Sequence, residues 1–318
     1  MKEKKLDFSG KKVLVIGDVM LDRYVSGHVH RISPEAPVPV LNLQHIDEKP
    51  GGAANVAMNL FSLGMEVTLL SVTGDDEISA KLQSILADEI NTVFLKDSSR
   101  RTSIKTRFMS GNQHLMRLDD ETLSDINHDL EQLTVNTFNE IIHSKEIHAI
   151  VLQDYNKGLL TTSLIKEILI EANRRKIPTF VDPKEKNFLA YKGCTVFKPN
   201  KKEIIHASAL QTEDYNQYVQ WLKERLHHHW TCLTLGSKGI FLHDGNKGMH
   251  FPTRKQEIVD VCGAGDTVLS VLVGCYLQNL PFEEIGYILN IAGGQVCRKP
   301  GVAIIDANQL FSEFSLIK

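Results

Sequence analysis

Short apolar runs alternate with longer segments of helical periodicity along most of the chain. The first run, Lys12–Ile16, ends in Gly17 and Asp18, as expected for a buried parallel strand that opens into a site. Further strand-like runs are Val67–Val72, Ala149–Leu152, Pro178–Val181, Thr195–Phe197 and Cys232–Leu235, and helix-length segments are Glu77–Ala87, Ile126–Ile142, Leu160–Arg174 and Tyr215–Leu226. Strands separated by helices form right-handed crossovers. The pattern predicts an α/β fold, with a mainly parallel central sheet and helices on both faces.

Two segments do not follow this alternation. Residues 23–48 contain three prolines within a strand-like pattern, which favours an extended flap outside the main sheet. In residues 100–119, two alternating runs flank Gly111 and Asn112, which is the pattern of a hairpin. Together the two segments predict a small β lid over the site of a single domain that spans residues 1–318.

Composition narrows the function classes. The 318 residues are 42% hydrophobic, enough for a sizeable core, and a net charge of −3 without a basic stripe argues against nucleic acid as a partner. No apolar run approaches the ~20 residues that cross a bilayer, and no apolar leader begins the chain, so we expect a cytoplasmic protein without a membrane segment.

The five cysteines are widely spaced and indicate reduced packing residues. His227, His228 and His229 are consecutive and are interpreted as a solvated helix face, because consecutive helical positions cannot converge on one metal ion.

Polar residues follow several of the predicted strands. Asp18 comes after the first strand, and later strands are followed by Asp182 and Lys184, by Asn200, and by Gly236. The carboxyl ends of parallel strands meet at one edge of a sheet, where open α/β folds bind their ligands. We therefore expect the site at this edge.

Residues 261–267 have the clearest chemical signature. The amides of Gly263, Ala264 and Gly265 precede a helix-like apolar run, and at a helix N-terminus they would form an anion hole. Asp266 lies beside them and is suited to take a proton from a hydroxyl during phosphoryl transfer. A tight turn with Asp266 as the helix N-cap explains the stretch equally well.

Two motifs in a fixed order give the chain a resemblance to a known family. Residues 51–57 read Gly-Gly-x-x-Asn-x-Ala, and residues 260–266 read Asp-x-x-Gly-Ala-Gly-Asp. With these motifs the chain resembles the ribokinase-like (PfkB) sugar kinases over essentially its whole length. The resemblance implies the ribokinase-like fold, ATP and Mg²⁺, and a sugar hydroxyl as the phosphoryl acceptor.

A narrower resemblance lies in residues 17–24, 31–40 and 50–57, which are similar to the D-glycero-β-D-manno-heptose-7-phosphate kinases. It implies phosphorylation of the anomeric O1 to the 1,7-bisphosphate, a step toward ADP-heptose and the lipopolysaccharide core. Some members carry a fused nucleotidylyltransferase domain, and we expect none here because the chain ends at Lys318. The alternatives are a family kinase for another sugar or sugar phosphate and, more remotely, an inactive sugar or nucleotide sensor.

The resemblance also implies roles for single residues. Asp266 would be the general base, and the amides of Gly263, Ala264 and Gly265 the anion hole. Sugar hydroxyls would be held by Asp18, Gly51, Gly52 and Asn55, whereas Asp22 would either join them or only fix the turn.

On the nucleotide side, Asn200 and Glu203 would place Mg²⁺ and the phosphates, with Glu203 reaching the metal through water. A helix N-cap at Asn200 with Glu203 as its partner is a structural alternative, and both roles can hold at once. Gly236 and Ser237 would flank the nucleotide, and Asn290 would form part of the adenine wall.

A substrate that already bears a phosphate needs a fixed cation. The predicted hairpin supplies Lys105, Arg107 and Arg117, although a solvated lid surface explains these charges as well. Lys184 follows a buried strand and is expected to contact the substrate or the γ-phosphate.

The chain departs from the subfamily at several positions. Gln153 and Asn156 stand where Ser and Gly are usual, Gly293 and Gly294 replace an alanine-rich helix wall, and Pro300 replaces a leucine. These changes leave the nucleotide preference open. The apolar lid positions, among them Val38, Val40 and Leu43, would be covered by a second copy of the chain, which predicts a homodimer through the lid.

Overall fold

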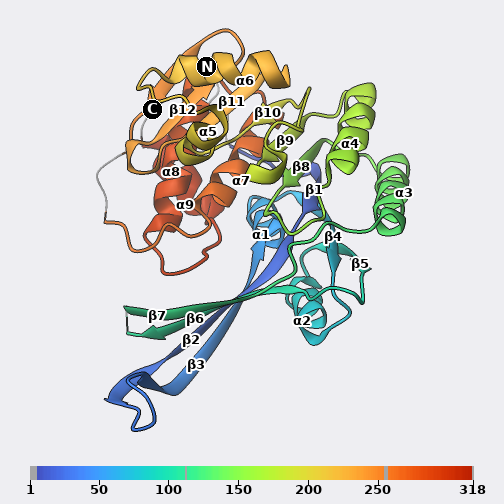
Figure 1. Cartoon of the computed structure of the whole chain (residues 1–318). Helices are drawn as coiled ribbons and strands as arrows, with labels where there is room; N and C mark the ends of the chain where they lie inside the picture. Colours follow the sequence, from blue (N-terminus) through green and yellow to red (C-terminus); the bar gives the residue numbers. More distant parts are fainter. Residues whose placement is uncertain (1–5, 112, 254–256, 317–318) are drawn as a thin grey trace.

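The computed structural model describes residues 6–111, 113–253 and 257–316. In these ranges the main sheet has nine strands, in the spatial order β13-β12-β11-β10-β9-β8-β1-β4-β5 (Figure 1). The strands are β1 Lys12–Gly17, β4 Glu66–Thr73, β5 Asn91–Lys96, β8 Ala149–Gln153, β9 Thr179–Asp182, β10 Val196–Phe197, β11 Trp230–Thr234, β12 Ile240–His243 and β13 Gly248–Phe251. Neighbours from β11 to β5 pair in parallel, and β12 and β13 pair antiparallel. The predicted mainly parallel sheet is confirmed.

Helices cover both faces of this sheet. Strand β1 shows the cause, because Val13 and Val15 lie in one hydrophobic core and Leu14 and Ile16 lie in the other. The first core also takes side chains from α1 (Ala53–Ser62), α2 (Glu77–Leu86), α7 (Ala264–Leu277), α8 (Phe282–Cys297) and α9 (Ala307–Ser315). The second takes them from α3 (His128–Ser144), α4 (Thr162–Arg175), α5 (Lys201–Ser208) and α6 (Tyr215–Leu226).

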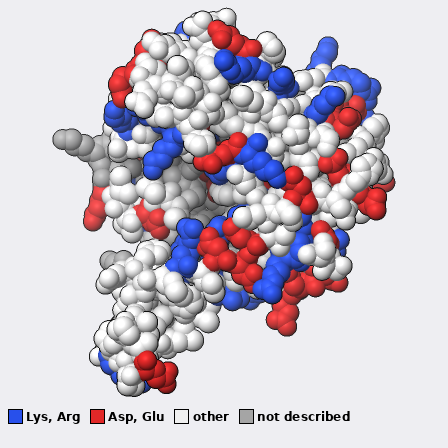
Figure 2. All heavy atoms as spheres, viewed as in Figure 1, with Lys and Arg blue, Asp and Glu red and all other residues white. Residues whose placement is uncertain are grey.

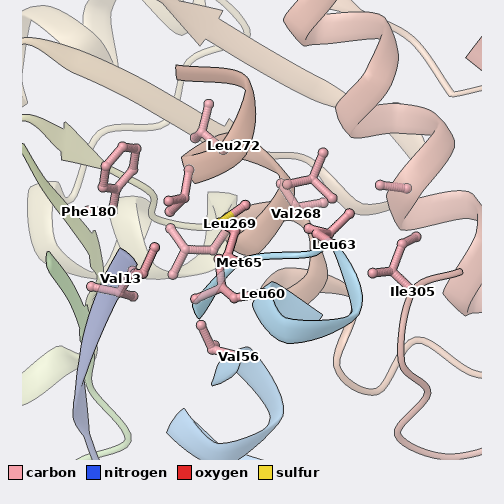
Figure 3. Packing of buried hydrophobic residues seen from close by; sticks show 14 of the residues in the cluster. Val13, Val56, Leu60, Leu63, Met65, Phe180, Val268, Leu269, Leu272 and Ile305 are labelled. Atoms are coloured by element: carbon pink, nitrogen blue, oxygen red, sulfur yellow. The ribbon is translucent and has the colours of Figure 1, made fainter. Parts of the chain in front are cut away.

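Packing of α1 against α7 sets up the site. Figure 3 shows Val56 and Leu60 of α1 in the same core as Leu269 of α7 and Val13 of β1. All four side chains are fully buried. The N-terminal ends of both helices are thereby held at the carboxyl edge of the sheet.

The predicted lid is a separate sheet of four strands within the described residues, in the order β3-β2-β6-β7, and it projects from the body (Figure 1). Its strands are β2 Val19–Ile32, β3 Pro39–Gly52, β6 Ser103–Ser110 and β7 Gln113–Asp120. The first two strands extend further toward the body than predicted, because their inner ends, such as Leu21, are buried in the first core. Gly111 lies at the predicted hairpin turn, whereas Asn112 lies outside the described residues.

Three strands were not predicted. β5 is a half-buried edge strand, so its pattern is weaker than that of a central strand, and β12 and β13 form an antiparallel hairpin on the opposite edge. Crossovers through helices therefore do not account for the whole sheet.

The interpretation of the three histidines as a helix face is wrong. Helix α6 ends at Leu226, and His227 takes a left-handed conformation there. His228 is buried, with Nε2 2.6 Å from the Thr231 hydroxyl. Burial lowers the pKa of His228 to about 4, so this imidazole is neutral at pH 7.

Cys194, Cys232 and Cys275 are buried, and Cys262 and Cys297 are partly buried, all with free thiols. In the part of the chain that the structure describes, no helix is long and apolar enough to cross a membrane.

Candidate active site

The site lies at the carboxyl ends of β1, β8, β9 and β10. Asp18 follows β1, and Gln153 and Asp182 end the neighbouring strands β8 and β9, where they are register partners. Lys198 follows β10, and its amide donates to the carbonyl of Val181. These polar side chains thus meet at the edge of the sheet where the sequence predicts the site. Figure 2 shows a hollow between the body and the lid, with charged side chains beside it.

The carboxylate of Asp266 lies at the centre of this group and is buried. Asn55 donates through Nδ2 to Oδ2 at 2.7 Å. Tyr155 donates through its hydroxyl to Oδ1 at 2.9 Å, and Gln153 donates through Nε2 to the same oxygen at 3.1 Å. The structure thus brings together Asn55 and Asp266, which are 211 positions apart in sequence.

Burial and, after it, the nearby charge of Asp182 raise the pKa of Asp266 to about 6. Hydrogen bonds from Asn55 and Tyr155, together with the charge of Lys198, act in the opposite direction. Lys198 pairs with Asp182 at 3.0 Å, and both are buried. A carboxyl group with this pKa is ionised above neutrality and accepts a proton readily, as a general base requires.

Helix α7 begins beside this carboxylate without a side-chain cap. Its N-cap is Gly263, whose φ of 76° lies in the left-handed region that favours glycine. Asp266 stands in the first turn and bonds to Asn55, Tyr155 and Gln153, so the alternative in which Asp266 is the N-cap is wrong. The amide of Ala264 donates to the carbonyl of Val261 at 3.3 Å, but no side chain caps the half-buried start of the helix at residues 263–265, which suits an anion.

Asp260, the first residue of the late motif, organises the approach to α7. Its Oδ1 accepts from the amide of Cys262 at 3.0 Å, and its Oδ2 accepts from the amide of Gly301 at 3.0 Å. The amide of Val302 donates to the hydroxyl of Tyr24 on lid strand β2 at 3.1 Å. The lid is therefore joined to the loop that precedes α7.

Asp18 is buried, and its carboxylate accepts backbone hydrogen bonds from Tyr155, Lys157 and Leu159 at 2.9 to 3.3 Å. Desolvation raises the pKa of Asp18. The structure directs this carboxylate at the loop that carries Tyr155, and its contact with sugar hydroxyls stays a prediction.

The diglycine at the end of β3 lies against β2. A Cβ on Gly51 would lie 2.1 Å from Oδ2 of Asp22, and one on Gly52 would lie 2.4 Å from the carbonyl oxygen of Asp18. Gly52 also has a φ of 61°. The two glycines therefore allow β3 to lie close to β2, and their contact with sugar hydroxyls stays a prediction.

Of the three lid cations, one lies at the site. Arg107 donates to Oδ1 of Asp22 at 2.5 Å, and its guanidinium lies over the ring of Tyr24, 5.1 Å from the centroid. Lys105 instead pairs with Asp119 and Glu121 at 3.0 Å. Arg117 is exposed and pairs with Asp119 at 2.8 Å. Arg117 thus lies on the lid surface, whereas Lys105 is largely buried beside its two acidic partners, and a phosphate contact of either residue stays a prediction.

Asn200 and Glu203 form the predicted capping box at the start of α5. The amide of Glu203 donates to Asn200 Oδ1 at 2.9 Å, and the amide of Asn200 donates to Glu203 Oε2 at 2.8 Å. Lys184 donates to Glu203 Oε1 at 2.7 Å, and its Nζ lies 5.4 Å from the centroid of the Tyr155 ring. Both oxygens of Glu203 have protein partners, which fits a contact to Mg²⁺ through water better than direct ligation.

Gly236, Ser237 and Asn290, which were also predicted on the nucleotide side, lie in other elements than Asn200 and Glu203. Gly236 and Ser237 begin an exposed turn of 3₁₀ helix (η2, Gly236–Lys238) after β11. Asn290 donates through Nδ2 to the carbonyl of Phe251 at 2.7 Å, so the amide of Asn290 fixes the end of β13.

Sequence reasoning gave no role to Gln153, Tyr155 or Lys198, and it gave Asp182 none beyond its place at a strand end. Each follows a buried strand, and this position is the signal that marks them in the sequence. Their contacts with one another depend on strand order, which the sequence alone does not state.

Comparison with known proteins decides the family. Residues 10–308 match the model of the pfkB family carbohydrate kinases. The chain belongs to this family. It is a sugar kinase, a phosphotransferase with an alcohol group as acceptor, as the resemblance of its two motifs predicted.

Among its relatives is the bifunctional protein HldE of Aliarcobacter butzleri, 37% identical over 312 residues. The corresponding protein of Actinobacillus succinogenes is 38% identical over 316 residues. The matches cover 96% and 98% of this chain, which spans 65% of the length of each relative.

Solved structures agree on the fold. Escherichia coli phosphofructokinase-2 in complex with substrates and products has a TM-score of 0.78 at 19% identity, covering 96% of this chain and 99% of that one. Its tetrameric inhibited form has a TM-score of 0.76 at 18% identity and the same coverage. The predicted ribokinase-like architecture is confirmed.

Proposed function

We propose that this sugar kinase transfers the γ-phosphoryl group of ATP to the anomeric O1 of D-glycero-β-D-manno-heptose 7-phosphate, giving the 1,7-bisphosphate. The similarity to relatives named HldE supports this acceptor, as does the amino-acid sequence of residues 17–57. The product would serve ADP-heptose and lipopolysaccharide core biosynthesis in the cytoplasm. The observation that carries the chemistry is the buried carboxylate of Asp266 beside the uncapped start of α7.

In the proposed reaction, Asp266 takes the proton of the anomeric hydroxyl as the sugar oxygen attacks the γ-phosphorus. The bond from phosphorus to the bridging oxygen breaks, ADP leaves with that oxygen, and the proton stays on Asp266. Amides at Gly263, Ala264 and Gly265 would stabilise the charge of the migrating group. Asn55 would orient the carboxylate through its bond to Oδ2.

Mg²⁺ would neutralise phosphate charge when bound with the nucleotide. Among the described residues no group of three or more His, Cys, Asp or Glu is arranged to hold a metal ion, so nucleotide phosphates and water would supply most ligands. Glu203 would contribute through water. Asn200 and Lys184 would lie on the phosphate side, with Gly236, Ser237 and Asn290 nearer the base and ribose.

Arg107 would bind the phosphate that the sugar already carries. Its contact with Asp22 uses part of a guanidinium that has five N–H donors, so others remain for an anion. The ring of Tyr24 fixes the plane of the group. Arg107 is preferred to Lys105, whose ammonium already contacts two carboxylates, and to Arg117, which is exposed and directed at Asp119.

A homodimer through the lid forms part of the proposal. Large apolar side chains on this sheet and on the loop between β2 and β3 are exposed, namely Ile32, Val38, Leu43, Ile46, Met116 and Leu118. A second copy of the chain would cover them.

The experiment that tests the acceptor is phosphoryl transfer from ATP to a panel of sugars. Heptose 7-phosphate should give the highest kcat/KM, above fructose 6-phosphate, ribose and nucleosides. A higher kcat/KM with another acceptor would contradict the proposed substrate and favour the alternative, a family kinase for another sugar.

A further inference from the structure

Gln153 connects two carboxylates at the floor of the site. It is the last residue of β8 and is completely buried. Its Nε2 donates to Asp266 Oδ1 at 3.1 Å and to Asp182 Oδ2 at 3.1 Å. Both N–H groups of one neutral amide are therefore directed at two acidic side chains from α7 and β9.

The backbone at Gln153 is fixed on both sides. Its carbonyl accepts from the amide of Asp18 at 3.2 Å, and a Cβ on the facing Gly17 would lie 2.9 Å from the Cβ of Gln153. The neighbouring strand leaves room for this residue only because position 17 is glycine. The side-chain amide of Gln153 is thus attached to a backbone position that is fixed in the centre of the sheet.

The other end of the amide has no partner. Oε1 of Gln153 is buried, and in the part of the chain that the structure describes it accepts no hydrogen bond. A buried acceptor without a partner lowers stability and calls for a functional explanation. An apolar residue of similar size would leave no unpaired acceptor at this position. The two hydrogen bonds that Nε2 donates therefore explain why a glutamine stands here.

We propose that Gln153 is a positioning residue for phosphoryl transfer, which fixes the carboxylate of Asp266 against the Asp182–Lys198 ion pair through the two hydrogen bonds of its Nε2. The inference rests on the proposed role of Asp266 as the base. Gln153 and Tyr155 donate to Oδ1, whereas among the described residues Asn55 alone donates to Oδ2, so Oδ2 is the oxygen that would face the sugar hydroxyl.

The charges around Asp266 explain why the amide matters. Asp182 faces it from β9, Lys198 from the end of β10, Lys184 from the loop after β9, and the Tyr155 hydroxyl from the loop after β8. Lys184 is already paired with Glu203, which leaves two carboxylates to share the ammonium of Lys198. Without the donor between them, one carboxylate would take up a proton more readily, and the base would be neutralised at higher pH.

The test is the pH profile of kcat/KM for the variant Gln153→Leu, which keeps the size of the side chain and removes both donors. We expect the acid limb to move up by about one pH unit, the effect of one lost charge-assisted hydrogen bond. The KM for ATP should change by less than about twofold. The matched control is Gln295→Leu, because Gln295 is a buried glutamine in α8 bonded to the backbone of Asp306, and its loss should leave the acid limb in place.

A second readout separates this inference from the proposed function. In protein labelled at the aspartate carboxyl carbons, the Asp266 resonance is assigned by its loss in Asp266→Asn, and its titration midpoint is followed by NMR in the wild type, Gln153→Leu and Gln153→Met. A higher midpoint in both variants supports the inference. An unchanged midpoint in both variants overturns it. A raised midpoint with an unmoved acid limb would contradict Asp266 as the base and leave the effect of Gln153 on its ionisation standing.

Discussion

At the scale of single residues, the site consists of buried acids whose partners come from distant parts of the chain. Asp266 was predictable because its motif stands at the start of a helix-like run, and Asn55 because it follows a diglycine. The bonds from Gln153 and Tyr155 were not predictable, because they depend on β8 lying between β1 and β9. The same holds for Asp18, whose carboxylate proved to support a loop 137 to 141 positions further along the chain.

The pH dependence of turnover follows from the ionisation of Asp266. Its pKa is raised to about 6, and a general base acts only when deprotonated. Turnover should therefore be full above about pH 7 and fall as the pH drops through 6, to about a tenth at pH 5. The measurement is kcat/KM between pH 5 and 9, with thermal unfolding at each pH to show that the protein is folded. A rate that stays constant down to pH 5 would contradict the assignment.

Arg107 and Arg117 offer a direct comparison on neighbouring lid strands. Arg107→Met should raise the KM for the sugar phosphate about tenfold or more, since charge-assisted hydrogen bonds contribute about 1.5–3 kcal/mol. It should also lower the free energy of unfolding, by about 3–5 kcal/mol, because Asp22 would remain buried without its cation. Arg117→Met, at an exposed pair, should change neither quantity appreciably. Equal KM values in the two variants would contradict phosphate binding by Arg107.

At the scale of elements, patterns with local causes were predicted best. The central strands are continuous apolar runs. The capping box of α5 lies within four consecutive residues, Asn200 to Glu203. Edge strand β5 and the hairpin of β12 and β13 were missed because half-buried strands lack that signature. The bounds of α6 were predicted as found, but the histidines that follow it were misjudged as a helix face, since the left-handed end of α6 at His227 has no distinctive pattern.

The start of α5 can be tested for two roles at once. Asn200→Ala removes the cap and should lower the free energy of unfolding by about 1 kcal/mol. It should also raise the KM for ATP if Glu203 has its proposed role beside the phosphates, because the cap fixes the carboxylate of Glu203. The matched control is Asn127→Ala, since Asn127 caps α3 in the same way by accepting from the amide of Leu130. If both variants lose stability and neither changes the KM for ATP, Asn200 has only the capping role.

At the scale of the whole molecule, the lid and the body are joined close to the reaction centre. Tyr24 on β2 accepts from the amide of Val302, and the neighbouring Gly301 is bonded to Asp260. The presence of a lid followed from its prolines and hairpin pattern. Which lid residues are covered and which are exposed could not be predicted from the sequence, because the pattern of a small sheet does not indicate what packs against it.

The homodimer makes a prediction about mass. Wild-type protein should sediment as a dimer, whereas Leu43→Lys combined with Met116→Lys should shift it toward the monomer by placing charge on the exposed apolar positions of the lid. The control is Leu133→Lys, an exposed leucine on α3 outside the lid, which should leave the mass unchanged. A monomeric wild type at micromolar concentration would contradict the proposal.

The role of Asp266 as the base is the central claim, and the rate of phosphoryl transfer in Asp266→Asn tests it most directly. With ATP and heptose 7-phosphate at saturation, kcat should fall by about 10²–10⁴-fold, the usual contribution of a general base. The affinity for ATP, measured by calorimetry, should change little, because the nucleotide side does not depend on this carboxylate. A kcat within about threefold of the wild-type value would contradict the claim.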